Sequence, residues 1–287
     1  MYNIAFNRLA KPWWHPNFIY NILPARVATD EIVENLNGFI KEIIIESWKR
    51  RKMFKNSKYG NFIPVVDRLA SYIEKNPDDI SSEDFMNHLM TLFTAAFDTL
   101  TIVSSFALLC FGMYPEYQEK AVEEIRSVIG ESPRPIALDE LNKLIYLDMC
   151  LKDVMRLFPI APFIIRRPLS DFSLGKWVIP KEAALLVSIY HVHRDERYWK
   201  CPYHFYPDHF LPDEVRKRHI FAFVPFSAGP RGCIGKTLAN VVLKLFLCNV
   251  LQRYEIEADG KVPDLELRSD ISLRPKYGYN CRLKKRM

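Results

Sequence analysis

Residues 226–235 read Phe-Ser-Ala-Gly-Pro-Arg-Gly-Cys-Ile-Gly, and this stretch decides the fold. It follows a short apolar run, FAFV at 221–224. Apolar residues at helical spacing come after it: Ile234, Leu238, Val241, Val242, Leu245 and Phe246. The pattern predicts a loop that presents Cys233 at the start of a buried helix. Unpaired backbone N–H groups and the positive end of the helix dipole favour a thiolate over a thiol at such a position.

The loop resembles the cysteine loop of the cytochrome P-450 haem-thiolate monooxygenases, whose pattern is F-x-x-G-x-R-x-C-x-G. Phe226, Gly229, Arg231, Cys233 and Gly235 match every fixed position of that pattern. Glycines let the backbone pass close to a flat partner, and an arginine can pair with a carboxylate. The resemblance implies that Cys233 is the axial ligand of the haem iron and that the other four residues bind the cofactor, with Arg231 on a propionate.

A competing pattern overlaps this loop. Residues 229–237 read GPRGCIGKT, and Gly-Lys-Thr before a helix suggests a phosphate-binding loop. That motif needs four residues between its first glycine and the final Gly-Lys-Thr. Counting back from Gly235 puts Pro230 at the first position, and proline has no N–H for a phosphate. A nucleotide-binding protein is therefore only a third hypothesis, which ATP binding would test.

The composition is typical of a globular protein with a sizeable core. Of the 287 residues, 49% are hydrophobic and 26% are charged, and the net charge is +6. Basic clusters at 49–52, 216–218 and 282–286 suit solvated faces or docking of an acidic protein or anionic lipid, and nucleic acid is not expected because no stacking aromatics interleave them. The six cysteines form no C-x-x-C pair and indicate a reducing compartment.

A long central helix is predicted at about 81–111, with Ser81 and Asp84 as a capping box. Between residues 89 and 114 Asp98 carries the only charge, and that length could span a bilayer. An ionised Asp near the centre of a span costs about 2.5–3.5 kcal/mol on insertion scales. The sequence therefore favours a core helix buried on all sides over a membrane span.

The remaining patterns predict a mainly α fold with a small β-sheet, in one partial domain over residues 1–287. Further helices are expected at about 115–130, 147–158 and 234–254, short strands over about 163–189, and a basic polar linker at 49–60. By the resemblance, this order is that of the C-terminal part of the cytochrome P-450 fold.

Residues 95–99, Ala-Ala-Phe-Asp-Thr, lie midway along the long helix. Asp98 and Thr99 bring proton-handling groups into an apolar stretch, although a threonine that bonds to its own helix carbonyl is the alternative. The family has A/G-G-x-D/E-T over the haem, which implies that Asp98 and Thr99 are catalytic residues that relay protons to oxygen. Ala96 replaces the usual glycine and Leu100 a second common threonine, so a narrower oxygen pocket is expected.

Asp153 and Arg156 lie on one face of a predicted helix. The family has E-x-x-R there, locked to an arginine of the following meander. Here the acid is shorter, and His209 stands where the arginine often sits. Because histidine lacks the fork geometry of arginine, the sequence predicts a weakened triad. The alternative is a surface ion pair worth about 0.2–0.5 kcal/mol.

Arg166 follows Ala-Pro-Phe at 161–163, where the family commonly provides an arginine for a haem propionate; an ordinary arginine at a strand end is the alternative. The histidines lack the spacing of metal ligands, and packing or surface roles are predicted for His191, His193, His204 and His219.

The resemblance implies a haem b monooxygenase similar to insect-type microsomal members. Such an enzyme would use O2 and electrons from NADPH, passed through a reductase, to oxidise a fatty acid-like or foreign lipophilic compound. Its pocket would be lined by Leu92, Phe93, Ala95, Phe97 and the strand after Pro162. The resemblance implies a location at the cytosolic face of the endoplasmic reticulum membrane and membrane association of the full-length form, although the N-terminus here has no apolar anchor run.

Length is the main objection to an active enzyme. Members of the family are usually far longer than 287 residues, so the resemblance covers the C-terminal part only. The second hypothesis is therefore a truncated, non-catalytic product, or an incomplete gene product, that binds haem weakly or not at all.

Overall fold

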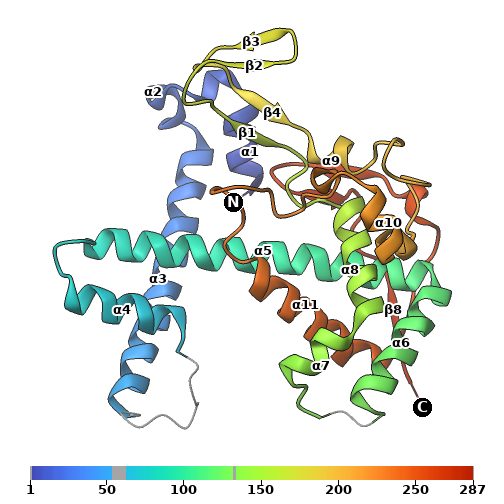
Figure 1. Cartoon of the computed structure of the whole chain (residues 1–287). Coiled ribbons are helices and arrows are strands. Elements are labelled where there is room, and N and C mark those ends of the chain that lie inside the picture. Colours follow the sequence, from blue (N-terminus) through green and yellow to red (C-terminus); the bar gives the residue numbers. More distant parts are fainter. Residues whose placement is uncertain (1, 54–62, 132–133, 287) are drawn as a thin grey trace. The chain divides into compact units, whose positions relative to one another are not determined.

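The computed structural model describes residues 2–53, 63–131 and 134–286 (Figure 1). The chain forms two compact units, Met1–Asp98 and Thr99–Met287, and their boundary falls inside one long helix, α5. The described residues are mainly helical, with short antiparallel strand pairs, which confirms the predicted fold class.

The first unit is helical. Its elements are α1 (Tyr2–Ala10), η1 (Pro12–Trp14), α2 (Asn17–Tyr20), α3 (Pro24–Met53), α4 (Val65–Lys75) and the first part of α5. Ile40, Ile44, Val66 and Leu89 form its buried apolar cluster. The linker predicted at 49–60 is wrong for residues 49–53, which end α3, because Lys, Arg and Met are good helix formers and cations favour a helix C-terminus. Residues 54–60 lie outside the described part.

Helix α5 runs over Ser82–Met113 and begins with the predicted cap. The Ser81 hydroxyl accepts the Asp84 N–H at 3.0 Å and donates to the Asp84 carboxylate at 2.7 Å. By length and composition α5 could cross a membrane. Its end is nevertheless a core helix, since Phe106, Ala107 and Cys110 are completely buried in the second unit. Burial on all sides is wrong for its middle, where Phe97 is 63% exposed, because the core of the second unit begins at Ile102.

Helices gather around the last part of α5 in the second unit (Figure 1). They are α6 (Pro115–Ile129), α7 (Leu138–Lys143), α8 (Ile145–Leu157) and α11 (Lys236–Leu251). Apolar residues spaced three and four apart on α6 and α8, such as Val122, Ile125, Leu147 and Leu151, are buried in this core. The core therefore fixes α8, which carries Asp153 and Arg156, and α11, which follows the cysteine loop.

Each strand pair that the structure describes is short and antiparallel. The pairs are β1 (Ile164–Arg166) with β4 (Leu185–Val187), β2 (Phe172–Leu174) with β3 (Trp177–Ile179), β5 (Tyr254–Glu257) with β8 (Arg282–Lys285), and β6 (Leu267–Ser269) with β7 (Leu273–Pro275). The β2–β3 hairpin turns at Gly175, whose φ of +58° suits a residue without a Cβ. The remaining elements are α9 (Ile189–Val192), η2 (Pro207–Phe210), α10 (Pro212–Lys217), η3 (Ile220–Ala222) and η4 (Val262–Asp264).

Candidate functional site

The loop 226–235 folds back on itself through its own backbone. The Cys233 N–H donates to the Phe226 carbonyl at 2.9 Å, and the Gly232 N–H donates to the Gly229 carbonyl at 2.9 Å. Helix α11 begins at Lys236, two residues later than predicted, so Cys233 lies just before its N-terminal end. The thiol is free and exposed. The loop thus presents an exposed sulfur just before the N-terminal end of a helix.

Two glycines of the loop have different structural reasons. Gly229 has a φ of +74°, a left-handed conformation that side chains disfavour. Gly232 lies in a tight place: a Cβ there would be 3.1 Å from the Gly229 carbonyl oxygen, so the loop would have to shift slightly. The sequence pattern leaves position 232 open, and only the folded loop shows this close approach.

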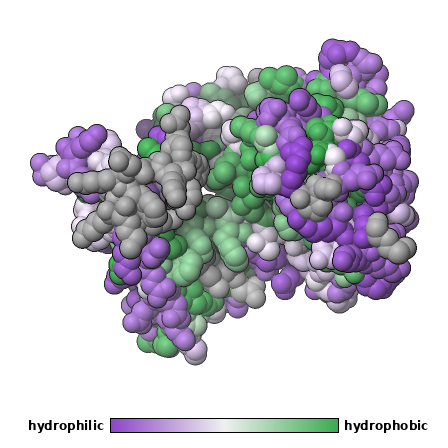
Figure 2. Space-filling model, turned by 90° about the horizontal axis from the view of Figure 1, so that it is seen from below, coloured by the Kyte–Doolittle hydropathy of each residue, from purple (hydrophilic) through white to green (hydrophobic). Residues whose placement is uncertain are grey.

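The surroundings of Cys233 expose apolar and cationic groups. Ile234 is 91% and Leu238 61% exposed. On the face drawn in Figure 2, hydrophobic residues (green) likewise lie at the surface beside hydrophilic ones (purple). The Arg231 guanidinium is exposed and, among the described residues, has no hydrogen-bond or ion-pair partner. The exposed aliphatic side chains fit a flat apolar group, and the unpaired cation fits a carboxylate on it. Haem is an apolar group that carries carboxylates, and its iron can bind a cysteine sulfur.

Arg166, the last residue of β1, reaches this loop. Its Nη2 donates to the Ser227 hydroxyl at 2.9 Å, and its Nη1 donates to the Ile165 carbonyl at 3.0 Å. Ser227 itself has a φ of +59°. The structure therefore brings Arg166 beside the cysteine loop, although the two are far apart in the sequence.

Asp98 and Thr99 are consecutive, half-buried residues of α5, and the boundary between the two units falls between them. Their catalytic role stays a prediction. Earlier in the same helix the hydroxyls of Thr91 and Thr94 donate to backbone carbonyls four residues back, at 2.8 Å each. A threonine hydroxyl bonded to a carbonyl of its own helix, which is the alternative considered for Thr99, therefore occurs elsewhere in this helix.

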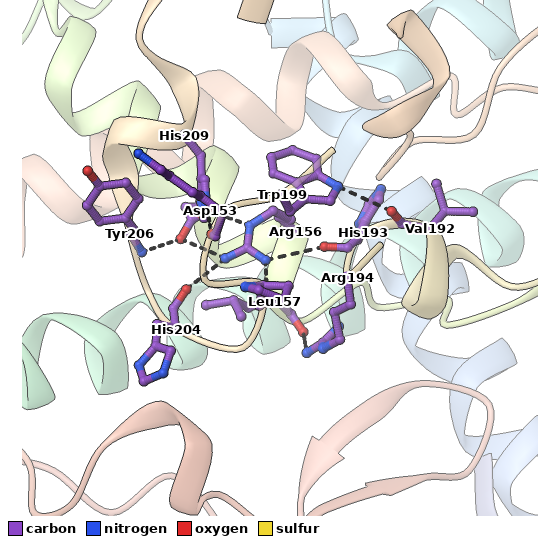
Figure 3. Close-up of polar contacts among 12 residues, drawn as sticks. Asp153, Arg156, Leu157, Val192, His193, Arg194, Trp199, His204, Tyr206 and His209 are labelled. Carbon is purple, nitrogen blue, oxygen red and sulfur yellow. Dashed lines mark hydrogen bonds and ion pairs between the residues drawn. The ribbon is translucent and has the colours of Figure 1, made fainter. Parts of the chain in front are cut away.

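Asp153 and Arg156 form a completely buried ion pair (Figure 3). Arg156 Nε donates to Asp153 Oδ1 at 2.6 Å, and Arg156 Nη2 donates to Oδ2 at 3.2 Å. The alternative of a surface pair is wrong, since both side chains have no exposed area. Burial acts to raise the pKa of Asp153, but the charge of Arg156 and the hydrogen bond from His209 lower it below its ordinary value. Asp153 is therefore a carboxylate.

His209 closes this cluster from η2. Its Nδ1 lies 2.9 Å from Asp153 Oδ1, and its Nε2 contacts the Lys200 carbonyl. A carboxylate and a carbonyl only accept hydrogen bonds, so each ring nitrogen of His209 faces an acceptor. The prediction of a weakened triad rested on the shorter acid and on the missing fork. All three side chains do meet, with the second contact of the ring made to backbone, and the strength of the triad stays a prediction.

The other donors of the cluster bind the meander between α9 and η2 to α8. Arg156 donates to the carbonyls of Pro202 and His204 at 2.6 and 2.8 Å, and the Tyr206 N–H donates to Asp153 Oδ2 at 2.6 Å. The buried charges thus satisfy backbone groups that have no partner in a helix or a strand.

One histidine that the sequence analysis placed among packing residues has a specific contact. The His193 ring is completely buried, and its Nε2 accepts the N–H of Val224 at 2.9 Å. Val224 lies just before the cysteine loop. No pattern in the sequence pointed to this contact.

Comparisons with known proteins agree with one another. A family model described as Cytochrome P450 matches residues 1–282. Cytochrome P450 4c3 of Drosophila melanogaster is 32% identical over 296 residues, which cover 98% of this chain and 55% of that protein. Cytochrome P450 4V2 of Homo sapiens is 34% identical over 295 residues, which cover 100% of this chain and 56% of that protein.

A solved structure shows the same fold. The crystal structure of a cytochrome P450 (CYP102L1) matches with a TM-score of 0.78 and 22% sequence identity, over 92% of this chain and 58% of that chain. The chain spans about half the length of the curated relatives it matches.

Proposed function

This chain belongs to the cytochrome P450 family, and on that premise we propose that it is the haem-binding part of a monooxygenase. The reaction would insert one oxygen atom of O2 into a lipophilic substrate. The observation that carries the proposal is the exposed Cys233 thiol, held by its own backbone bond to Phe226 just before helix α11.

Haem b, when bound, would supply the redox and oxygen chemistry. Cys233 would bind its iron through sulfur, and the exposed guanidinium of Arg231 would hold a propionate. Arg166, which already donates to the Ser227 hydroxyl of the loop, would hold a propionate as well. Phe226, Gly229 and Gly235 would shape the loop against the flat face of the cofactor.

We assign proton delivery to the Asp98 carboxylate and the Thr99 hydroxyl. A carboxylate in an apolar helix can take up a proton from solvent and pass it to a neighbouring hydroxyl. The small, exposed Ala95 and Ala96 precede them on α5 and leave room for another group to approach. Apolar residues of the same stretch, Leu92, Phe93 and Phe97, would contact a fatty acid-like or foreign lipophilic substrate.

Electrons would come from NADPH through a reductase, at the endoplasmic reticulum membrane where microsomal members of the family work. Much of the basic surface is already paired locally: Arg216 with Asp213, Lys217 with Glu214 and Lys284 with Glu257. Lys236, exposed at the start of α11 beside the loop, is the better candidate for contact with an acidic reductase.

The experiment is a reduced, carbon monoxide-bound absorption spectrum of the purified chain with added haem. We expect a long-wavelength, thiolate-type band that is lost in Cys233→Ala. The matched control is Cys201→Ser, which removes the other exposed cysteine and should keep the band.

A short-wavelength band, or no uptake of haem by the wild-type chain, would contradict the proposal. That result would favour the alternative, a non-catalytic product that binds haem weakly or not at all.

A further inference from the structure

His193 lies beside the buried Asp153–Arg156 ion pair (Figure 3), and all three residues belong to the second unit. Its backbone carbonyl accepts a hydrogen bond from Arg156 Nη1 at 3.3 Å. Its ring Nε2 accepts the N–H of Val224 at 2.9 Å. One residue therefore contacts the charge cluster through its backbone and the segment before the loop through its side chain.

The ring can accept at Nε2 only if it is neutral. Burial, together with the nearby cations Arg156 and Arg194, lowers the pKa of His193 to about 3. With Nε2 unprotonated, the proton of the neutral ring is on Nδ1. The hydrogen bond to Val224 therefore requires the neutral Nδ1–H tautomer, although Nδ1 is buried and has no hydrogen-bond partner among the described residues.

Val224 connects His193 to the cysteine loop through backbone hydrogen bonds. Its carbonyl accepts the Ser227 N–H at 3.0 Å, and Phe226 accepts the Cys233 N–H at 2.9 Å. The preceding residue, Phe223, packs its ring against that of His193 with the centroids 5.3 Å apart. Continuous contacts therefore run from Arg156 through His193 and Val224 to the backbone of Cys233.

We propose that His193 is a positioning residue that holds the cysteine loop in register by accepting the Val224 N–H at Nε2. It contacts neither the sulfur nor the proposed cofactor site, and it acts through the backbone of residues 224–227. The inference deepens the proposed function. Its consequence for a cysteine that binds haem iron rests on that function.

Three variants separate the hydrogen bond from packing. His193→Phe keeps a planar ring but removes the acceptor. In His193→Gln the amide oxygen is as many bonds from Cβ as Nε2 is, whereas in His193→Asn it reaches only as far as Nδ1. The control is His191→Gln, which changes the exposed histidine two positions earlier.

The measurement is hydrogen exchange of peptides covering residues 221–235 in the haem-free 287-residue chain. An N–H that loses its acceptor loses protection, so we expect exchange on the order of tenfold faster in His193→Phe and His193→Asn. Peptides from α6 and α8 should stay protected, and His193→Gln and the His191 control should resemble the wild type. Unchanged exchange in the loop of folded His193→Phe, or no rescue by Gln relative to Asn, would overturn the inference.

A second measurement needs no variant. A long-range 1H–15N correlation spectrum of the wild-type chain should show the His193 ring neutral, with the proton on Nδ1, even at pH 5, where an exposed histidine is charged. A charged ring, or a proton on Nε2, would overturn the inference, and this test stands even if the His193 variants do not fold.

The proposed function fails separately. If the chain takes up no haem but the exchange and tautomer results hold, His193 still positions the loop and only the monooxygenase proposal falls. If haem binds with a thiolate-type band in the wild type but loop exchange in folded His193→Phe is unchanged, the monooxygenase proposal stands and the positioning role falls.

Discussion

At the scale of single residues, His209 shows how a ring replaces a guanidinium fork. One ring nitrogen lies against the Asp153 carboxylate and the other against the Lys200 carbonyl. Asp153 thereby has three partners, the Arg156 guanidinium, the His209 ring and the Tyr206 N–H. These partners offset the cost of taking the carboxylate out of water, and removing one of them leaves the buried charge less well compensated.

We predict that His209→Ala lowers the free energy of unfolding by about 3 kcal/mol, because it removes one partner of a buried carboxylate. The measurement is the midpoint of urea unfolding by circular dichroism. His204→Ala is the control, since His204 has an exposed side chain and takes part only through its carbonyl. Equal midpoints for both variants would show that the His209 ring adds no net stability.

At the scale of elements, the end of α5 lies against the residues that follow β5. A Cβ on Gly112 would lie 2.8 Å from both the Cβ and the backbone nitrogen of Ala258. Gln118 of α6 binds the same strand, donating to the Ile256 carbonyl at 2.9 Å and accepting its N–H at 2.8 Å. These contacts hold Ala258 so close to Gly112 that a side chain does not fit at position 112. The backbone at Ala258 cannot move aside as a flexible side chain could.

We predict that Gly112→Ala destabilises the chain although alanine is the better helix former. Helix propensity favours alanine by about 1 kcal/mol, whereas overpacking in a core costs about 1–3 kcal/mol. The control is Gly38→Ala in α3, where nothing lies within 4 Å of the added methyl group, and it should stabilise by about 0.5–1 kcal/mol. Thermal unfolding compares the two; a higher midpoint for Gly112→Ala would contradict the packing argument.

At the scale of the whole molecule, the cysteines differ in burial. Cys110, Cys150 and Cys248 are buried and Cys281 is half-buried, whereas Cys201 and Cys233 are exposed. Burial raises the pKa of Cys110 and Cys150 well above the ordinary range and that of Cys248 to about 12. The buried thiols are therefore unreactive near neutral pH, and the proposed ligand belongs to the accessible group.

We predict that iodoacetamide at pH 8 modifies Cys201 and Cys233 of the haem-free chain before the buried cysteines, as read by peptide mass spectrometry. Added haem should protect Cys233 but not Cys201, because only the former lies in the loop. Protection of both cysteines, or of neither, would contradict a specific site at residues 226–235.

Much of the fold and part of the site could be predicted from local patterns. The cysteine loop, the capped start of α5 at Ser81 and the strand pairs near residues 163–189 depend on spacing and turn residues, which are properties of short segments. The predicted ends of the helices were less accurate. Residues 49–53 were assigned to a linker because they are mostly charged, although Lys, Arg and Met are good helix formers.

The sequence by itself determined the family, the mainly α class and the position of Cys233, since each follows from residues close together in the chain. Only the tertiary structure decided that both ring nitrogens of His209 face acceptors, that a side chain at Gly112 would meet Ala258 and that His193 holds Val224. In each case at least one partner is a backbone group, which every residue carries and no sequence pattern marks. Which of these groups meet is set by how the meander and β5 pack against the core helices, and buried polar groups must then find partners there.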